Sequence, residues 1–91
     1  MRQALHLTVS GRVQGVGFRW FVRQAGLALG LSGKVRNLAD GRVEIEVAGE
    51  EGALAAFRER VRQGPPGSHV TACDEQPLSP VPVWDGFAID R

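Results

Sequence analysis

Cysteine, aromatic residues and long apolar runs are all scarce in this 91-residue sequence. Cys73 is the only cysteine, which excludes an intramolecular disulfide and a metal site built from several cysteines. No apolar run approaches the roughly 18 residues of a membrane-spanning helix, and residues 1–10 lack the continuous apolar stretch of a signal peptide. These absences, with a length typical of one small domain, predict a single domain over residues 1–91 in a reducing, cytoplasmic setting with no membrane partner.

Acidic residues are missing from the first 39 positions of the chain. Residues 1–39 contain six basic and no acidic residues, whereas residues 40–91 contain five basic and ten acidic residues. The formal net charge of +1 hides this division. The near-neutral total argues against a strongly basic nucleic-acid-binding protein. The asymmetry predicts that the first half of the chain meets an anion.

Hydrophobic residues recur with the periods of strands and helices along the whole chain. The patterns predict a strand through residues 5–9, helices over 18–29 and 50–63, a hairpin of 32–39 with 42–48, and strands at 69–75 and 84–90. The order βαββαβ indicates an α+β, ferredoxin-like sandwich, an antiparallel sheet with two helices on one face. The fifth strand would extend an edge of that sheet, or complete the final β unit if residues 69–75 are less regular.

The register of the predicted hairpin determines where its polar residues point. A two-residue loop would pair charged with apolar residues across the strands. A three-residue loop, 39–41, instead pairs Arg36 with Glu44 on a solvated face, which favours this register. Asn37 then lies opposite Val43 on the apolar face, an unusual place for an amide.

Residues 15–19 join the first strand to the first helix and have the features of an anion site. Glycines expose backbone N–H groups, and a helix N-terminus adds unpaired donors and a positive dipole end. Arg19 would lie in the first helical turn, where the dipole disfavours a cation, and no acidic residue is near it in sequence. A bound anion would resolve this conflict. A plain turn, a solvated Arg19 and an Asn37 that caps the 40–41 turn are the ordinary alternatives.

Two segments resemble the signature sequences of the acylphosphatases. They are Gly11-Arg-Val-Gln-Gly-Val-Gly-Phe-Arg19 and Gly33-Lys-Val-Arg-Asn37. The spacing between them, the turn at 40–41 and the terminal Phe87-Ala-Ile89 match as well. The similarity covers essentially the whole chain, and a nearly continuous match of the first segment is far more specific than a loose glycine pattern.

The resemblance implies a small ferredoxin-like enzyme that hydrolyses the carboxyl–phosphate bond of acyl phosphates to a carboxylate and inorganic phosphate, with no cofactor and no metal. It implies that Arg19 and Asn37 are catalytic, the first binding the phosphate and the second orienting the attacking water. The implied phosphate cradle consists of the backbone amides of Gly15, Val16, Gly17, Phe18 and Arg19. Lys34 stands where the family commonly has an aromatic residue, which leaves the preference among acyl groups open.

Two other functions fit parts of the pattern. RNA-recognition domains share the ferredoxin-like fold but stack bases on aromatic residues of the open sheet face. Here that face is predicted to carry His6, Thr8, Arg36, Glu44 and Glu46. A domain that handles carbamoyl phosphate, as in hydrogenase-maturation carbamoyltransferases, would sit in a much longer chain than one ending at residue 91. We therefore expect a small-molecule acyl phosphate as partner, no nucleic acid, and a monomer.

Overall fold

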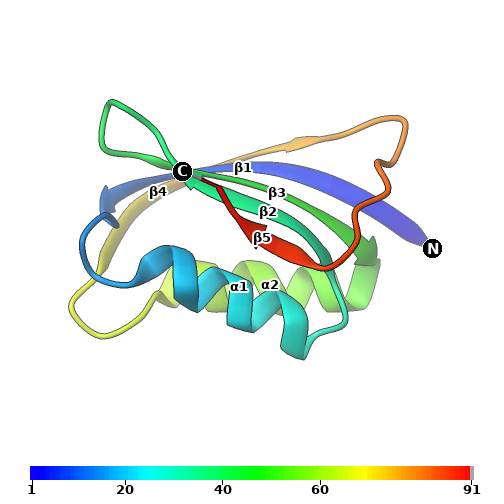
Figure 1. Ribbon diagram of the computed structural model, residues 1–91, viewed down its shortest axis with the longest axis horizontal. Helices are drawn as coiled ribbons and strands as arrows, with labels where there is room; N and C mark the ends of the chain where they lie inside the picture. Colours follow the sequence, from blue (N-terminus) through cyan, green and yellow to red (C-terminus); the bar gives the residue numbers. More distant parts are fainter. Residues whose placement is uncertain (91) are drawn as a thin grey trace.

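The computed structural model describes residues 1–90, so Arg91, the last residue of the predicted domain, lies outside the described part. The elements are β1 (Arg2–Arg12), α1 (Phe18–Ala28), β2 (Ser32–Asn37), β3 (Val43–Glu50), α2 (Glu51–Gln63), β4 (His69–Pro77) and β5 (Phe87–Ile89). Both helices lie under the same face of the sheet (Figure 1). The predicted α+β, ferredoxin-like fold is confirmed. Among residues 1–90, no helix is long and apolar enough to cross a membrane.

The sheet is mixed, with the strand order β4-β1-β3-β2-β5. The first four strands pair antiparallel, as predicted, whereas β5 pairs with β2 in parallel. The chain leaves β4 at one edge and must cross to the other edge, where it meets β2 in the parallel direction. The fifth strand therefore extends an edge, but it is shorter than the predicted 84–90, and β4 runs two residues beyond the predicted end at 75.

The hairpin of β2 and β3 adopts the predicted register. Arg36 pairs with Glu44 and Asn37 with Val43, and the Leu38 N–H donates to the Arg42 carbonyl at 2.8 Å across a three-residue loop. On the open face, Glu44 accepts from Arg36 Nε at 2.6 Å and lies 3.0 Å from His6 Nε2. These hydrogen bonds, the one with His6 first, hold the pKa of Glu44 below its ordinary value.

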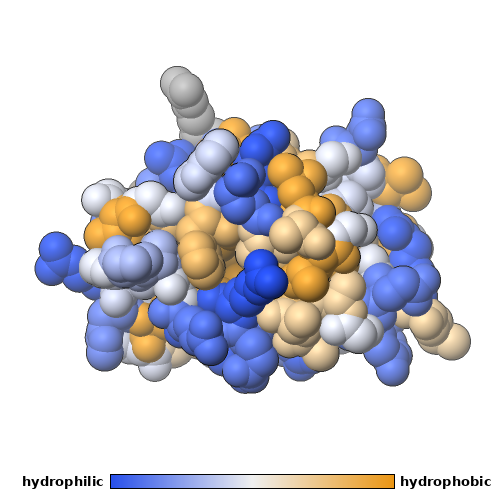
Figure 2. All heavy atoms as spheres, turned by 90° about the horizontal axis from the view of Figure 1, so that it is seen from below, coloured by the Kyte–Doolittle hydropathy of each residue, from blue (hydrophilic) through white to orange (hydrophobic). Residues whose placement is uncertain are grey.

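The hydrophobic core lies between the sheet and the two helices. Each helix buries one stripe of side chains: Phe18, Val22 and Ala25 from α1, and Leu54, Phe57 and Val61 from α2. Seen from the helical side in Figure 2, hydrophobic side chains form several separate patches with hydrophilic side chains between them. The core therefore fixes both helices against the sheet, and with them the loop that precedes α1.

The end of α1 directs the chain into β2. Gly30 has a left-handed φ of 71°. The Leu31 N–H donates to the Gly26 carbonyl at 2.9 Å, and the Gly30 N–H donates to the Leu27 carbonyl at 3.1 Å. This is the common helix end in which a glycine takes the left-handed conformation. Because it sets where β2 begins, it also helps to place Asn37 at the far end of that strand.

Two glycines inside helices predict opposite effects of the same substitution. A Cβ at Gly52 in α2 meets no neighbouring atom, whereas one at Gly26 in α1 would overlap the ring of Phe87 on β5. We expect Gly52→Ala to raise the free energy of unfolding by about 0.5–1 kcal/mol, and Gly26→Ala to lower it by about 1–3 kcal/mol. Urea unfolding of both variants checks this; equal shifts in the same direction would contradict it.

Candidate active site

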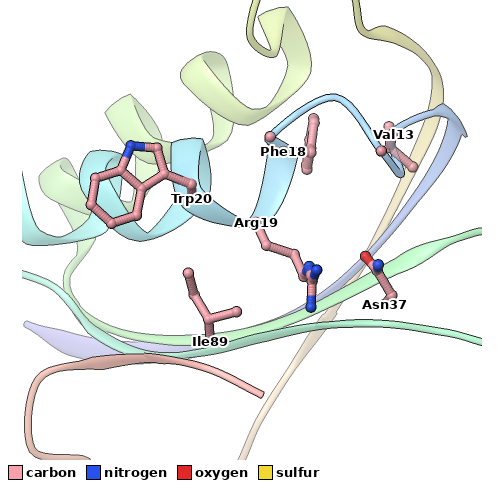
Figure 3. Close-up of a pocket in the computed structure, with 8 residues that line it drawn as sticks. Val13, Phe18, Arg19, Trp20, Asn37 and Ile89 are labelled. Carbon is pink, nitrogen blue, oxygen red and sulfur yellow. The ribbon is translucent and has the colours of Figure 1, made fainter. Parts of the chain in front are cut away.

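A cavity of about 190 Å³ lies where the β1–α1 loop, the first turn of α1 and the ends of β2 and β5 meet. This is many times the roughly 10–15 Å³ that one water requires. Its lining consists of Val13, Gly15, Gly17, Phe18, Arg19, Trp20, Asn37 and Ile89. The structure thus brings both predicted catalytic residues, and three more of the predicted phosphate-binding residues, to one place (Figure 3).

The β1–α1 loop has the backbone conformation that only glycine adopts easily. Gly15 and Gly17 have φ values of 74° and 76°, in the left-handed region. An L residue with a side chain pays roughly 1–2 kcal/mol there. Gly17 is the N-cap residue of α1 and supplies no capping side chain. The first N–H groups of the helix, which have no partner within a helix, therefore belong to residues that line the cavity.

Val16 is the one predicted phosphate-binding residue that does not line the cavity. Its half-buried side chain packs against the hydrophobic core. Only its backbone N–H is thus available for the predicted role, which stays a prediction.

Arg19 enters the cavity with little to neutralise it. Its recorded hydrogen bond runs from Nη1 to the carbonyl of Asp90 at the long distance of 3.5 Å. The first turn of α1 contains no acidic residue, and within residues 1–90 no carboxylate forms a salt bridge with Arg19; Arg36, by contrast, pairs with Glu44 at 2.6 Å. A guanidinium has five N–H donors. Most of those of Arg19 are available to an anion.

Asn37 lines the same cavity, and its side-chain carbonyl oxygen is buried. Its Oδ1 is buried and has no hydrogen-bond partner in the described structure. Leaving such an acceptor unpaired costs about 1–3 kcal/mol, so the site is suited to a small polar partner such as water. The alternative of a turn cap finds no support, because Asp40 caps that turn by accepting from the Arg42 N–H at 3.1 Å. In Figure 3 the amide of Asn37 lies beyond the tip of Arg19.

Within the described part of the chain, no ionisable side chain other than Arg19 lines this cavity. Among residues 1–90, no three His, Cys, Asp or Glu residues form a group that could hold a metal ion. The site therefore offers a cation, backbone donors and an amide. These groups can bind and orient an anion and a water, but they include no side chain suited to act as a general base.

Gln14 lies in the β1–α1 loop beside the cavity, and its role was not predicted from the sequence. Its Nε2 donates to the carbonyl of Leu38 at 2.9 Å and to that of Arg42 at 3.0 Å. These two bonds tie the β1–α1 loop to the hairpin immediately after Asn37. The only signal in the sequence is its place within the segment 11–19, because nothing local shows that it reaches the hairpin.

We expect Gln14→Ala to lower both stability and turnover. The variant loses two hydrogen bonds, which contribute about 1–2 kcal/mol together, and it releases the loop from the strand that carries Asn37. Urea unfolding and kcat measure the two effects. Gln3→Ala is a matched control, because Gln3 Nε2 bonds to Glu51 at 3.2 Å on the exposed surface, away from the cavity. Unchanged kcat in Gln14→Ala would contradict a positioning role.

Lys34 lies outside the cavity. Its Nζ is 3.6 Å from Glu46 Oε1, on the face of β2 opposite to Gly33 and Asn37. The departure from the usual aromatic residue at this position therefore changes the open face of the sheet and does not change the lining of the site.

Comparisons with known proteins agree with this geometry. The sequence model of the family described as Acylphosphatase matches residues 5–89. An acylphosphatase of Lacticaseibacillus paracasei is 43% identical over 90 residues, which are 98% of this chain and 97% of that protein. The crystal structure of acylphosphatase from Bacillus subtilis superposes with a TM-score of 0.95 at 41% identity, and the match covers 100% of both chains. Full-length HypF in its phosphate- and nucleotide-bound form gives a TM-score of 0.88 at 31% identity, over 100% of this chain and 12% of that one.

The sequence matches extend over nearly the whole chain, and the structural match shows the same fold. They also agree with the resemblance carried by the segments 11–19 and 33–37, and the residues of these segments that line the cavity include Arg19 and Asn37. The chain belongs to the acylphosphatase family and is a hydrolase of acyl phosphates.

Proposed function

We propose that this hydrolase binds the phosphate of its substrate with Arg19 and the backbone amides of residues 15–19, and that Asn37 holds the attacking water. The single observation that supports this proposal most is the pairing of two unsatisfied groups in one cavity. Arg19 has no carboxylate partner in the described structure, and Asn37 has a buried Oδ1 without a hydrogen bond. One phosphate and one water would satisfy both.

Phosphate binding explains the arrangement of the loop and of Arg19. In phosphoryl transfer, negative charge spreads over three equatorial oxygens of the transition state. The fork of a guanidinium can donate to two of these oxygens at once. The N–H groups at the start of α1 add further donors and the positive end of the helix dipole. Because these donors are already in place before reaction, they stabilise the transition state without reorganisation.

Asn37 would orient the nucleophile. Its side-chain amide would accept from the water through Oδ1 or donate to it through Nδ2, and either hydrogen bond holds the water in line with the phosphorus. The new P–O bond forms as the bond to the acyl oxygen breaks, and the carboxylate leaves with the electron pair. A phosphate oxygen takes the proton of the water, so acyl phosphate dianion plus water becomes carboxylate plus dihydrogen phosphate. A carboxylate is a stable leaving group, so this step needs no general acid.

The charge needed at the site is supplied by Arg19 and by the helix N-terminus, and we propose a reaction without a metal ion or cofactor.

We also propose that the chain acts as one domain and as a monomer. One cluster of buried side chains includes residues from all seven helices and strands except β4, whose Val70 and Cys73 pack against it.

The function is tested with benzoyl phosphate, acetyl phosphate and phenyl phosphate as substrates, each with and without EDTA. We expect phosphate release from both acyl phosphates, unaffected by EDTA. Phenyl phosphate should be resistant, because phenolate is about six pKa units more basic than a carboxylate and the site has no acid to protonate it. Loss of activity in EDTA, or comparable rates on phenyl phosphate, would contradict the proposed mechanism.

Carbamoyl phosphate belongs in the same panel because it tests the alternative of a domain that handles carbamoyl phosphate. Its carbamate is also a good leaving group, so the proposed site would act on it. A kcat/KM for carbamoyl phosphate far above those for benzoyl and acetyl phosphates would favour a role in carbamoyl transfer over general acyl phosphate hydrolysis.

A further inference from the structure

The end of the cavity away from Asn37 is apolar. Trp20 of α1 and Ile89 of β5 both line the cavity, and Figure 3 shows them on the other side of Arg19 from Asn37. Trp20 is 58% exposed, although large aromatic side chains usually gain most from burial. The other large hydrophobic residues exposed among residues 1–90 are Met1, Leu27 and Val83, none of which lines the cavity.

In-line geometry gives this apolar end a direction relative to the reaction. The attacking and leaving oxygens lie on opposite sides of the phosphorus. If Asn37 holds the water on one side of the phosphate, the acyl group departs on the opposite side. That side is where Trp20 and Ile89 lie, so the acyl group meets an apolar surface as soon as the phosphate is bound.

Trp20 is held in place by contacts that leave it accessible. The guanidinium carbon of Arg23 lies 5.7 Å from the centroid of the Trp20 ring. Arg23 is itself anchored, because its Nε donates to the carbonyl of Phe87 at 3.0 Å. Phe87 and Ile89 belong to the same short strand, β5. The indole, the guanidinium and the strand therefore form one connected wall. Because Trp20 is already held in this wall, it loses less conformational freedom when an acyl group binds.

We propose that Trp20 and Ile89 are the acyl-binding surface of this enzyme, and that its preferred substrates are acyl phosphates with an aromatic or other bulky apolar acyl group. This inference rests on the proposed function, because the position of the acyl group follows from the roles of Arg19 and Asn37. It assigns the preference among acyl groups to position 20 and not to position 34, whose side chain pairs with Glu46 outside the cavity.

The contact with the acyl group changes little between the bound substrate and the transition state, so its loss should appear in KM and not in kcat. We expect Trp20→Ala to raise KM for benzoyl phosphate about tenfold, toward the lower end of what hydrophobic pockets achieve because this surface is open. Its kcat should stay within about twofold. KM for acetyl phosphate, which has only a methyl group to offer, should be nearly unchanged. Trp20→Phe keeps a flat aromatic surface and should retain most of the affinity for benzoyl phosphate.

Leu27→Ala and Lys34→Ala are the matched controls. Leu27 is an exposed apolar residue farther along α1 and does not line the cavity, and we expect neither control to alter either KM. Equal changes for both substrates in Trp20→Ala, no change for benzoyl phosphate, or a Trp20→Phe variant as impaired as Trp20→Ala would overturn the inference while the proposed function stands. A parent enzyme that hydrolyses neither substrate would instead overturn the proposed function and the inference with it.

Discussion

Replacement of Arg19 by alanine is expected to reduce kcat/KM for benzoyl phosphate by at least about 100-fold. Loss of one preorganised donor to a developing oxyanion costs on the order of 3 kcal/mol, and each 1.36 kcal/mol corresponds to a factor of about ten. Among residues 1–90, Arg19 is the only charged side chain in the lining of the cavity, so no other described residue of the lining can supply its charge. Both KM and kcat should worsen, because the guanidinium contacts the phosphate in the ground state and in the transition state.

Two further variants separate the geometry of Arg19 from its charge. Arg19→Lys keeps the charge but lacks the planar fork, so it should recover only a small part of the activity. Arg12→Ala removes a cation from the exposed end of β1 and should change kcat/KM less than about threefold. Because the one hydrogen bond that Arg19 makes to the described residues is long, at 3.5 Å, its removal should leave the unfolding midpoint nearly unchanged. Full activity in a folded Arg19→Ala variant would contradict its assignment to phosphate binding.

Replacement of Asn37 by alanine is expected to lower kcat by about 100-fold with KM within about twofold of the parent value. Orientation of the water matters mainly in the transition state, so its loss should appear in kcat. Stability should respond in the opposite sense. The parent structure leaves Oδ1 of Asn37 buried without a partner, a cost of about 1–3 kcal/mol that the alanine variant does not have. The free energy of unfolding should therefore be maintained or raised while turnover falls.

Ser32→Ala is the matched control for this pair of effects. Ser32 Oγ is the other buried side-chain atom without a hydrogen-bond partner in the described structure, and it lies on the same strand as Asn37 but not in the cavity. We expect its removal to leave stability and kcat near the parent values or to raise stability slightly. An Asn37→Ala variant that is clearly less stable than the parent, with turnover reduced only in proportion to unfolding, would assign Asn37 a structural role.

Local patterns were sufficient for the elements and for the register of one hairpin. The side chains that the structure buries in α1 and α2 recur at helical spacing, which is the pattern that predicts these two helices. Cross-strand pairing of Arg36 with Glu44 correctly selected the three-residue loop. That register by itself predicts that Asn37 lies opposite Val43 on the apolar face. Each of these features depends on residues close in sequence, where periodicity and charge pairing act directly.

Contacts between distant segments were not predictable in the same way. The direction and length of β5 depend on which edge of the sheet the chain reaches after residue 77, and the local pattern is compatible with either edge. The hydrogen bonds of Gln14 to the hairpin carbonyls depend on the distance between two loops. The lining of the cavity by Trp20 and Ile89 depends on the packing of α1 beside β5. The spacing of residues along the chain predicts none of these distances.

The sequence by itself determined the chemistry available to this protein: an arginine after a glycine-bearing loop, an asparagine on the apolar face of a strand, and the family to which both segments point. Only the tertiary structure decided how these groups meet. Among residues 1–90, it leaves Arg19 without a carboxylate and the buried Oδ1 of Asn37 without a donor. Both residues line one cavity, and Trp20 and Ile89 give that cavity an apolar surface opposite the asparagine. The physical reason is that unsatisfied hydrogen-bonding capacity is a property of burial and of neighbours in space, which the order of residues does not state.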